Sequence, residues 1–238
     1  MIIPITSPAL DAESEQEFAS YAFPDTEISV THLDYGPASI ESELDEAICV
    51  PDFLNKAKQA EKEGYDAVIS DCFLDPGVKA AREILSIPVV GAAEASMHFA
   101  ASLGHRFSVV TVVPNIISSI ENLAAEHGIG NKLSSVRYVS IPVLELGDKA
   151  KLIDALHREM VSAVKEDDAH VLVLGCTGMM GVAKEMERQL KRDGYEIPVV
   201  DPAAASLKFA ESLVSMKLKQ SRLTYMPPPE KPRSYVRE

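Results

Sequence analysis

Cysteine is scarce in this 238-residue chain, and what is missing around it excludes several classes of protein. Only Cys49, Cys72 and Cys176 are present, an odd number that does not suit a disulfide scaffold. No CxxC pair or histidine-rich cluster has the spacing of a zinc site. No GxGxxG or GxxxxGK[ST] pattern indicates nucleotide binding. We therefore expect no metal and no cofactor.

Basic residues and long apolar runs are also in short supply. The chain has 23 Lys and Arg against 36 Asp and Glu, and its net charge of −13 opposes binding to nucleic acid or to an anionic membrane. No run approaches the roughly 18–20 apolar residues of a membrane helix, and residues 1–15 lack the features of a signal peptide. We expect a cytoplasmic homo-oligomer that acts on a small molecule.

Short, β-branched apolar segments alternate with amphipathic ones along the chain. This alternation is typical of an α/β fold with buried parallel strands. Helices are expected between the strands, and two of them end at Gly64 and Gly128, which are good C-caps. The expected strands are Ile2–Thr6, Glu27–Leu33, Ala67–Ser70, Pro88–Gly91, Phe107–Val113, Val136–Ile141, Val171–Leu174 and Pro198–Val200.

The chain also repeats a pattern. In each half, a strand leads to a cysteine, a helix follows, and an IPVV segment comes next. The cysteines, Cys72 and Cys176, are 104 residues apart, and the IPVV segments are 110 residues apart. The repeat predicts two lobes of four strands each, at about residues 1–95 and 96–205. The proline-rich, charged residues 226–238 are predicted to form a surface tail.

Cys72 and Cys176 each lie between a predicted strand and a predicted helix. Ligands collect at the carboxyl ends of parallel strands, and a helix N-terminus lowers the pKa of a thiol. A single cysteine there is ordinarily a small buried hydrophobe, which is our interpretation of Cys49. Two at equivalent positions can flank one pocket if the lobes face each other. One thiolate would then remove a proton beside a carbonyl, and the other thiol would return one on the opposite face.

Neighbours of these junctions are candidates for substrate binding. Phe73 forms a bulky wall, Thr177 offers a hydroxyl, and Gly178 lets backbone amides approach a ligand. Ser7 follows the first strand and Thr111 ends a strand of the second half. Each of the latter two either donates a hydrogen bond to the substrate or serves the local structure, as a cap does.

Other polar residues near the expected site are interpreted as structural. We expect Asp71 to point away from its neighbour Cys72, because successive strand residues face opposite sides. Glu94 is expected in the first turn of a helix and His98 on a helix surface. Lys79 and Arg82 are expected on a solvated helix face.

Several segments resemble the aspartate/glutamate/hydantoin racemase superfamily, most closely its hydantoin racemase branch. They are DPGVKAARE after Cys72, IPVVGAAEAS, FSVVT, IPVLEL, VLGCTGM around Cys176, and IPVVDPAAASLKFAESL. The resemblance extends from Ile2 to Leu213. It implies two flavodoxin-like lobes related by pseudo-twofold symmetry, with a cleft between them. It also implies a C-terminal helix, at about 206–220, that completes the first lobe, and paired catalytic cysteines at Cys72 and Cys176.

The sequence departs from the branch at four positions where the family binds substrate. Ser7 stands where Asn is usual, Leu74 where Gly is usual, and Thr177 where Ala is common. Val112 follows Thr111 in place of a second Thr. The substrate therefore stays open among hydantoins, ureido compounds such as allantoin, and amino acids. A maleate-type cis–trans isomerase and a non-catalytic small-molecule binding protein are the alternative functions.

Overall fold

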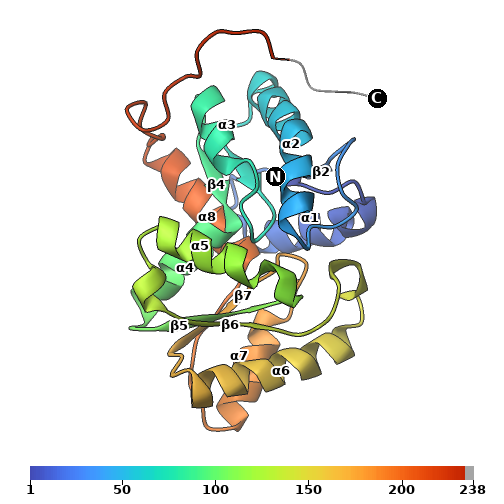
Figure 1. Cartoon of the computed structure of the whole chain (residues 1–238), viewed down its shortest axis with the longest axis vertical. Coiled ribbons are helices and arrows are strands. Elements are labelled where there is room, and N and C mark those ends of the chain that lie inside the picture. The colour runs from blue at the N-terminus through green and yellow to red at the C-terminus, as the bar shows by residue number, and fades with distance from the viewer. Residues whose placement is uncertain (234–238) are drawn as a thin grey trace.

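The computed structural model describes residues 1–233 and contains two four-stranded parallel sheets (Figure 1). The order of strands is β2-β1-β3-β4 in the first sheet and β6-β5-β7-β8 in the second. The strands are β1 (Ile2–Ile3), β2 (Thr31–His32), β3 (Val68–Ser70), β4 (Val89–Gly91), β5 (Phe107–Thr111), β6 (Leu133–Tyr138), β7 (Val171–Leu174) and β8 (Val199–Val200).

Helices connect the strands and cover the sheets. The α-helices are α1 (Asp11–Tyr21), α2 (Glu43–Glu63), α3 (Val78–Ile84), α4 (Ala92–Leu103), α5 (Ile117–Glu126), α6 (Lys149–Glu166), α7 (Ala183–Arg192) and α8 (Pro202–Ser215). Short 3₁₀ turns lie at η1 (Pro8–Leu10), η2 (Pro114–Ile116), η3 (Gly130–Lys132) and η4 (Val143–Glu145). The predicted fold class, two flavodoxin-like lobes of parallel strands, is confirmed.

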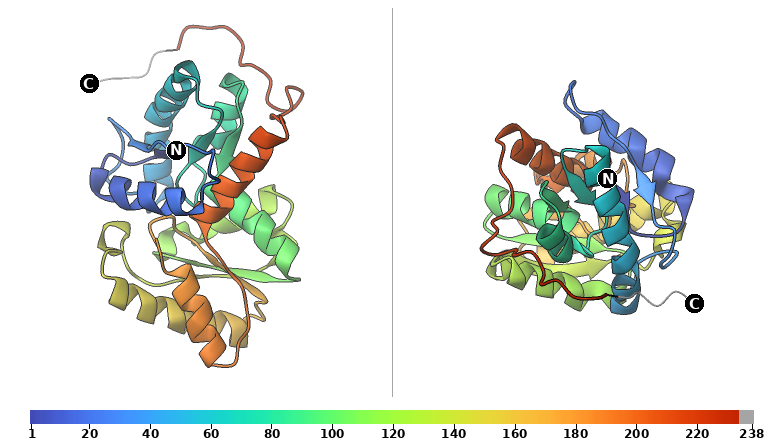
Figure 2. Two further views of the ribbon diagram at one scale, coloured as in Figure 1. Left: turned by 180° about the vertical axis from the view of Figure 1, so that it is seen from behind. Right: turned by 90° about the horizontal axis from the view of Figure 1, so that it is seen from above.

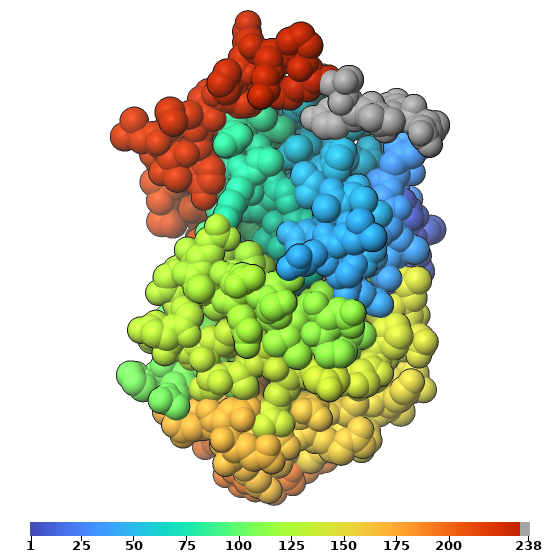
Figure 3. Space-filling view, viewed as in Figure 1, coloured from blue at the N-terminus to red at the C-terminus, as the bar shows by residue number. Residues whose placement is uncertain are grey.

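The two lobes exchange one helix each. After β4 of the first sheet, α4 packs against β7 of the second sheet, and after β8 of the second sheet, α8 packs against β3 and β4 of the first. The two helices also pack extensively on each other. Figure 2 shows α8, in orange-red, returning along the first lobe. This reciprocal exchange is the pseudo-twofold symmetry, and it brings the lobes into the direct contact seen in Figure 3.

Local sequence signals fix the ends of these helices. Ser42 caps α2 by accepting a hydrogen bond from the Asp45 amide, and Gly64 ends that helix in the left-handed region at φ 91°. Asp201 accepts hydrogen bonds from two amides at the start of α8, and Pro202 occupies its first position. The cap of α8 thus orients one of the two helices that carry the contact between the lobes.

Three expected strands differ from the structure by three residues or more at one end. The strand expected over 27–33 is paired only at Thr31–His32, at the edge of the sheet. The strand expected over 2–6 is paired only at Ile2–Ile3. The strand expected over 136–141 is instead Leu133–Tyr138, because Val139 and Ile141 are buried in the loop that follows it. The positions of apolar residues therefore predict which residues are buried, but not where the hydrogen-bonded strands begin and end.

The segment around Arg222, after α8, lies on the first lobe. Arg222 donates hydrogen bonds to backbone carbonyls of residues 82, 83 and 85, and residues 226–233 have no helix or strand. Residues 234–238 of the predicted tail lie outside the described residues. The expected division of the lobes at residue 95 falls inside α4 and stays a prediction. Within residues 1–233, no helix combines the length and apolar character needed to cross a membrane.

Candidate active site

A cavity of about 40 Å³ lies between the lobes, and the thiol-bearing loops after β3 and β7 meet there. It is narrow, because a cavity needs roughly 10–15 Å³ to hold one water molecule, so this cavity has room for only a few. Its lining is mostly apolar. The lining residues are Ile3, Pro4, Ile5, Leu10, Ile40, Asp71, Cys72, Phe73, Leu74, Val112, Ile116, Val143, Gly175, Cys176, Thr177 and Gly178.

The two cysteines occupy equivalent turns. The carbonyl of Cys72 accepts a hydrogen bond from the amide of Asp75, and the carbonyl of Cys176 accepts one from the amide of Met179, both at 3.1 Å. Amide N–H groups just beyond each cysteine donate to its sulfur, that of Leu74 to Cys72 and those of Gly178 and Met179 to Cys176. Backbone groups are therefore placed to stabilise a thiolate at either position.

Burial affects the pKa of the thiols in the opposite direction to those amides. Desolvation raises the pKa of the Cys72 thiol well above its ordinary value and raises the pKa of Cys176 to about 12. The negative charges of Asp71 and Glu41 raise the pKa of Cys176 further. The lowering expected from the sequence is therefore wrong, because loss of water outweighs the few N–H donors. Both sulfurs rest as neutral thiols, and a thiolate formed here is a strong base.

Asp71 lies beside both thiols and was interpreted from the sequence only as structural. Asp71 is 4% exposed, and its Oδ1 has no hydrogen-bond partner among the described residues. Thr177 donates to the carbonyl of Asp71 at 3.1 Å, which joins the loop after β7 to the end of β3. Burial raises the pKa of Asp71 to about 7. The sequence signal was an acidic residue placed between an apolar strand and a cysteine.

Of the predicted substrate-binding residues, the structure brings Phe73, Thr177 and Gly178 to the cavity, but not Ser7 or Thr111. Ser7 caps η1, where its hydroxyl accepts a hydrogen bond from the Ala9 amide at 3.3 Å. Thr111 is fully buried and donates to the carbonyl of Gly175 at 2.8 Å. Both hydroxyls serve the local structure.

The DPG turn after Cys72 caps α4, a structural role that the sequence did not predict. Asp75, at φ 51°, accepts hydrogen bonds from the amides of Ala93 and Glu94 at 2.8 Å and so caps α4. A side chain at Gly91 would meet this carboxyl group within 2.5 Å, which explains the glycine. The loop that holds Cys72 is thereby fixed to the helix that joins the two lobes.

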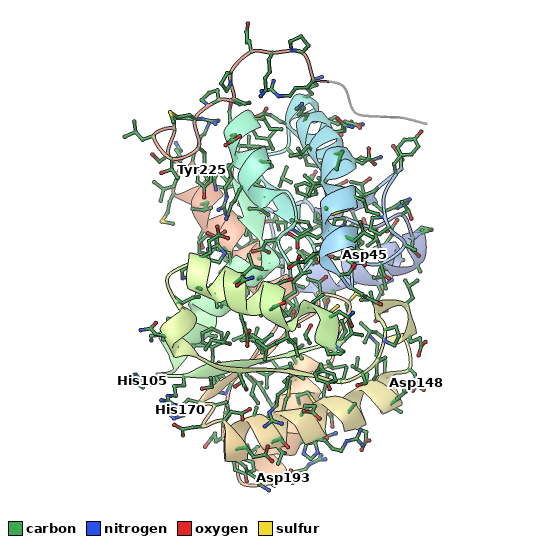
Figure 4. The ribbon with its side chains drawn as sticks, viewed as in Figure 1. Asp45, His105, Asp148, His170, Asp193 and Tyr225 are labelled. Atoms are coloured by element: carbon green, nitrogen blue, oxygen red, sulfur yellow. The ribbon has the colours of Figure 1, made fainter. Side chains whose placement is uncertain are left out.

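The expectation of a solvated Arg82 is wrong. Arg82 is 5% exposed, pairs with Glu94, and donates to the carbonyl of Val89 at 2.9 and 3.0 Å. Tyr225, labelled in Figure 4, accepts a further hydrogen bond from its guanidinium group at 3.2 Å. Glu94 lies in the first turn of α4, as expected. Lys79 on the same helix is exposed, as expected, so the prediction of a solvated position on α3 fails only at Arg82.

No residue set in the cavity resembles a metal site, and within residues 1–233 one group of side chains has that spacing. It comprises Glu94, His98 and His127, whose ligand atoms lie within 4.8 Å of one another. None of the three lines the cavity between the lobes.

Two parallel lobes that each present a thiol to a shared cavity define a class, the two-lobed α/β isomerases. The sequence matches the model of the Asp/Glu/hydantoin racemase family over residues 1–210. The chain belongs to this family, and it is an isomerase, a racemase.

Individual relatives agree over nearly the whole length. The chain is 39% identical over 237 residues to a hydantoin racemase of Pseudomonas sp. (strain NS671), covering 99% of this chain and 93% of that protein. An allantoin racemase from Klebsiella pneumoniae has a TM-score of 0.90 at 34% identity, covering 98% of this chain and 94% of that one. A maleate isomerase from Pseudomonas putida S16 shares only the fold, with a TM-score of 0.64 at 16% identity over 91% of each chain.

Proposed function

We propose that this chain racemises or epimerises a hydantoin-like or ureido substrate without a cofactor, by proton transfer between Cys72, Cys176 and a carbon next to a carbonyl. The observation that carries the proposal is that both thiols line one cavity from equivalent turns of two lobes. The relatives named hydantoin racemase and allantoin racemase support the same class of substrate. That the chain works as a homo-oligomer stays a prediction.

The chemistry follows from the two positions. One sulfur, as thiolate, takes the proton from the stereogenic carbon, and the C–H electron pair passes into the adjacent carbonyl to give an enolate. The opposite sulfur, as thiol, then gives its proton to the other face of that carbon. The first sulfur ends as thiol and the second as thiolate, so the reverse reaction begins from the product state. No redox step or outside reactant is needed.

The raised pKa values suit a weakly acidic carbon. A thiolate whose conjugate acid has a high pKa accepts a proton from carbon more readily than an ordinary thiolate does. The amides of Leu74, Gly178 and Met179 keep that thiolate accessible by donating to sulfur. The narrow, mostly apolar cavity leaves room for few water molecules, and water would weaken the base.

The lining also favours a neutral substrate. Among the described residues that line the cavity there is no Lys, Arg or His, and Asp71 is the one acidic residue. A dicarboxylate such as maleate would bring two negative charges into a buried site without a cationic side chain. A neutral cyclic amide or ureido compound brings N–H groups and carbonyls, which backbone groups can bind. We therefore place hydantoin-like and ureido compounds ahead of amino acids and of maleate.

Single replacements of each thiol test the proposal. Each pure enantiomer of a 5-substituted hydantoin and of allantoin is incubated in deuterated water with the wild-type chain, Cys72→Ser or Cys176→Ser. We expect each variant to lose racemisation in both directions by roughly 10²–10⁴-fold, since a hydroxyl is a far weaker base than a thiolate. Each variant still exchanges deuterium into one enantiomer, and the two variants differ in which one.

The matched control is Cys49→Ser, because Cys49 is buried in α2 and does not line the cavity. It should retain turnover within a few-fold of wild type. Full racemisation by either Cys72→Ser or Cys176→Ser would contradict the paired-thiol mechanism. Binding of the substrates with no exchange in the wild-type chain would instead favour a non-catalytic binding protein.

A further inference from the structure

A second cluster of chemistry-bearing side chains lies outside the cavity, where α4 packs against α5. Glu94 and His98 are four residues apart on α4, so they share one face of that helix. His127 is the C-terminal cap of α5. The ring centroids of His98 and His127 are 5.8 Å apart, edge to face, and one ligand atom from each of the three residues lies within 4.8 Å of the others.

The carboxylate of Glu94 is held in place while one oxygen remains turned toward the histidines. Oε2 pairs with Nη2 of Arg82, and Oε1 lies 3.4 Å from Nη1 of the same guanidinium and 4.0 Å from Nδ1 of His127. Carboxylate ligands of metal ions are commonly held by such an outer hydrogen bond, which fixes their orientation. Arg82 can fill this role because it is itself anchored on the carbonyl of Val89.

His127 has a buried ring nitrogen with nothing to bind. Its Nε2 is inaccessible to solvent and has no hydrogen-bond partner among the described residues. The other nitrogen of this ring, Nδ1, lies 4.0 Å from the Glu94 carboxylate, and a buried nitrogen without a partner on such a ring calls for a ligand.

We propose that Glu94, His98 and His127 bind one Zn²⁺ ion per chain, with water as the remaining ligand. Two imidazole nitrogens and one carboxylate oxygen form a donor set that Zn²⁺ accepts. The side chains of Glu94 and His127 are 17% and 13% exposed, which leaves the site open to water and to an entering ion. The guanidinium of Arg82 repels a dication, so we expect weaker binding than at a closed structural zinc site.

The position of the cluster gives the ion a structural consequence. It would link α4 to α5 of the second lobe and, through Glu94 and Arg82, to α3 of the first lobe. Because the three residues do not line the cavity, the ion takes no part in proton transfer. We expect Zn²⁺ to stabilise the folded chain by binding it in preference to the unfolded chain.

The test must separate this site from the cysteine thiols, because thiolate sulfur is in general a zinc ligand. Tag-free, chelator-treated chain is titrated with Zn²⁺ by calorimetry, both as wild type and as a thiol-free chain with Cys49→Ser, Cys72→Ser and Cys176→Ser combined. We expect one ion per chain to bind in the thiol-free background. At one hundred times the dissociation constant, the melting temperature should rise by roughly 5–10 °C. Co²⁺ in place of Zn²⁺ should give the visible absorption of nitrogen and oxygen ligands without a thiolate band.

Three histidine variants in the thiol-free background decide the assignment. His98→Ala and His127→Gln should each weaken Zn²⁺ binding more than about tenfold. The control, His105→Ala, should leave it unchanged, since His105 is exposed in the loop before β5 (Figure 4). His98 is only partly buried, so its variant should fold, which circular dichroism checks. Equal isotherms for the thiol-free chain with and without His98→Ala, or no saturable binding in the thiol-free chain, would overturn the proposal.

Discussion

Raising the pH should increase racemisation far beyond the range in which an ordinary thiol becomes fully ionised. Burial raises the pKa of Cys72 well above its usual value and that of Cys176 to about 12. The two-thiol mechanism needs one thiolate and one thiol, and the fraction of the chain in that form grows tenfold per pH unit below the lower of the two pKa values. An ordinary thiol, with a pKa near about 8.5, gains only about fourfold in thiolate between about pH 8 and pH 10. A thiol with a pKa of about 12 gains about a hundredfold over the same range.

The assay is the loss of optical rotation of one enantiomer, from which kcat/KM is obtained at each pH after the rate without enzyme is subtracted. Two substrates of different acidity are compared. A change of slope in the plot of log kcat/KM against pH that reflects ionisation of the substrate will shift between them, whereas one that reflects ionisation of the enzyme will not. We expect log kcat/KM to rise with a slope near 1 up to about pH 10 for both. A shared plateau above about pH 9 would refute the reasoning, because it would mean that the amides at Leu74, Gly178 and Met179 outweigh desolvation.

Three further changes test the packing around the site by urea unfolding. Arg82→Ala should lower the free energy of unfolding by about 3–5 kcal/mol, because it leaves the Glu94 carboxylate buried without its partner. Gly91→Ala should lower it by about 1–3 kcal/mol, since the new methyl group meets the Asp75 carboxyl group that caps α4. Asp71 binds its proton more tightly in the folded chain, where its pKa is about 7, so its stabilising contribution is full at low pH and is lost as the pH rises through 7. Between about pH 5 and pH 8, the free energy of unfolding should therefore fall by about 1–3 kcal/mol less in Asp71→Asn than in the wild-type chain. An equal fall in both would mean that Asp71 is ionised throughout this range.

The sequence predicted the thiol positions because they depend on topology alone. A strand that ends at a cysteine places that residue at the carboxyl edge of the sheet whatever the details of packing. The repeated pattern then implied two such edges. The structure has both cysteines at matching turns that line one cavity. The direction in which each neighbouring side chain points at those edges depends on the exact register of the strands, and the pattern of apolar residues in the sequence does not give that register.

Thr111 shows how a single residue decides the outcome. Successive strand residues face opposite sides, so either Thr111 or Val112 turns toward the cavity but not both. In the structure Val112 lines the cavity, and Thr111 turns into the sheet to bind the carbonyl of Gly175. The Arg82–Glu94 pair was missed for another reason: the partners lie on different helices, α3 and α4, and no local spacing brings them together. Burial of a charge is decided by such tertiary pairing.

A racemase must handle two mirror-image substrates, and the duplicated lobes give it a framework in which each thiol has an equivalent position. The surroundings of the two thiols nevertheless differ. Cys72 is followed by the buried side chains of Phe73 and Leu74, whereas Cys176 is followed by Thr177 and Gly178. A side chain at Gly178 would come within 3.0 Å of Leu146 and 3.5 Å of the Cys176 sulfur, so this face must stay small. On the proposed mechanism, pseudo-symmetry supplies two bases, and we expect the unequal walls to hold the substituent of both enantiomers in one orientation while their exchanging hydrogens point to opposite sulfurs.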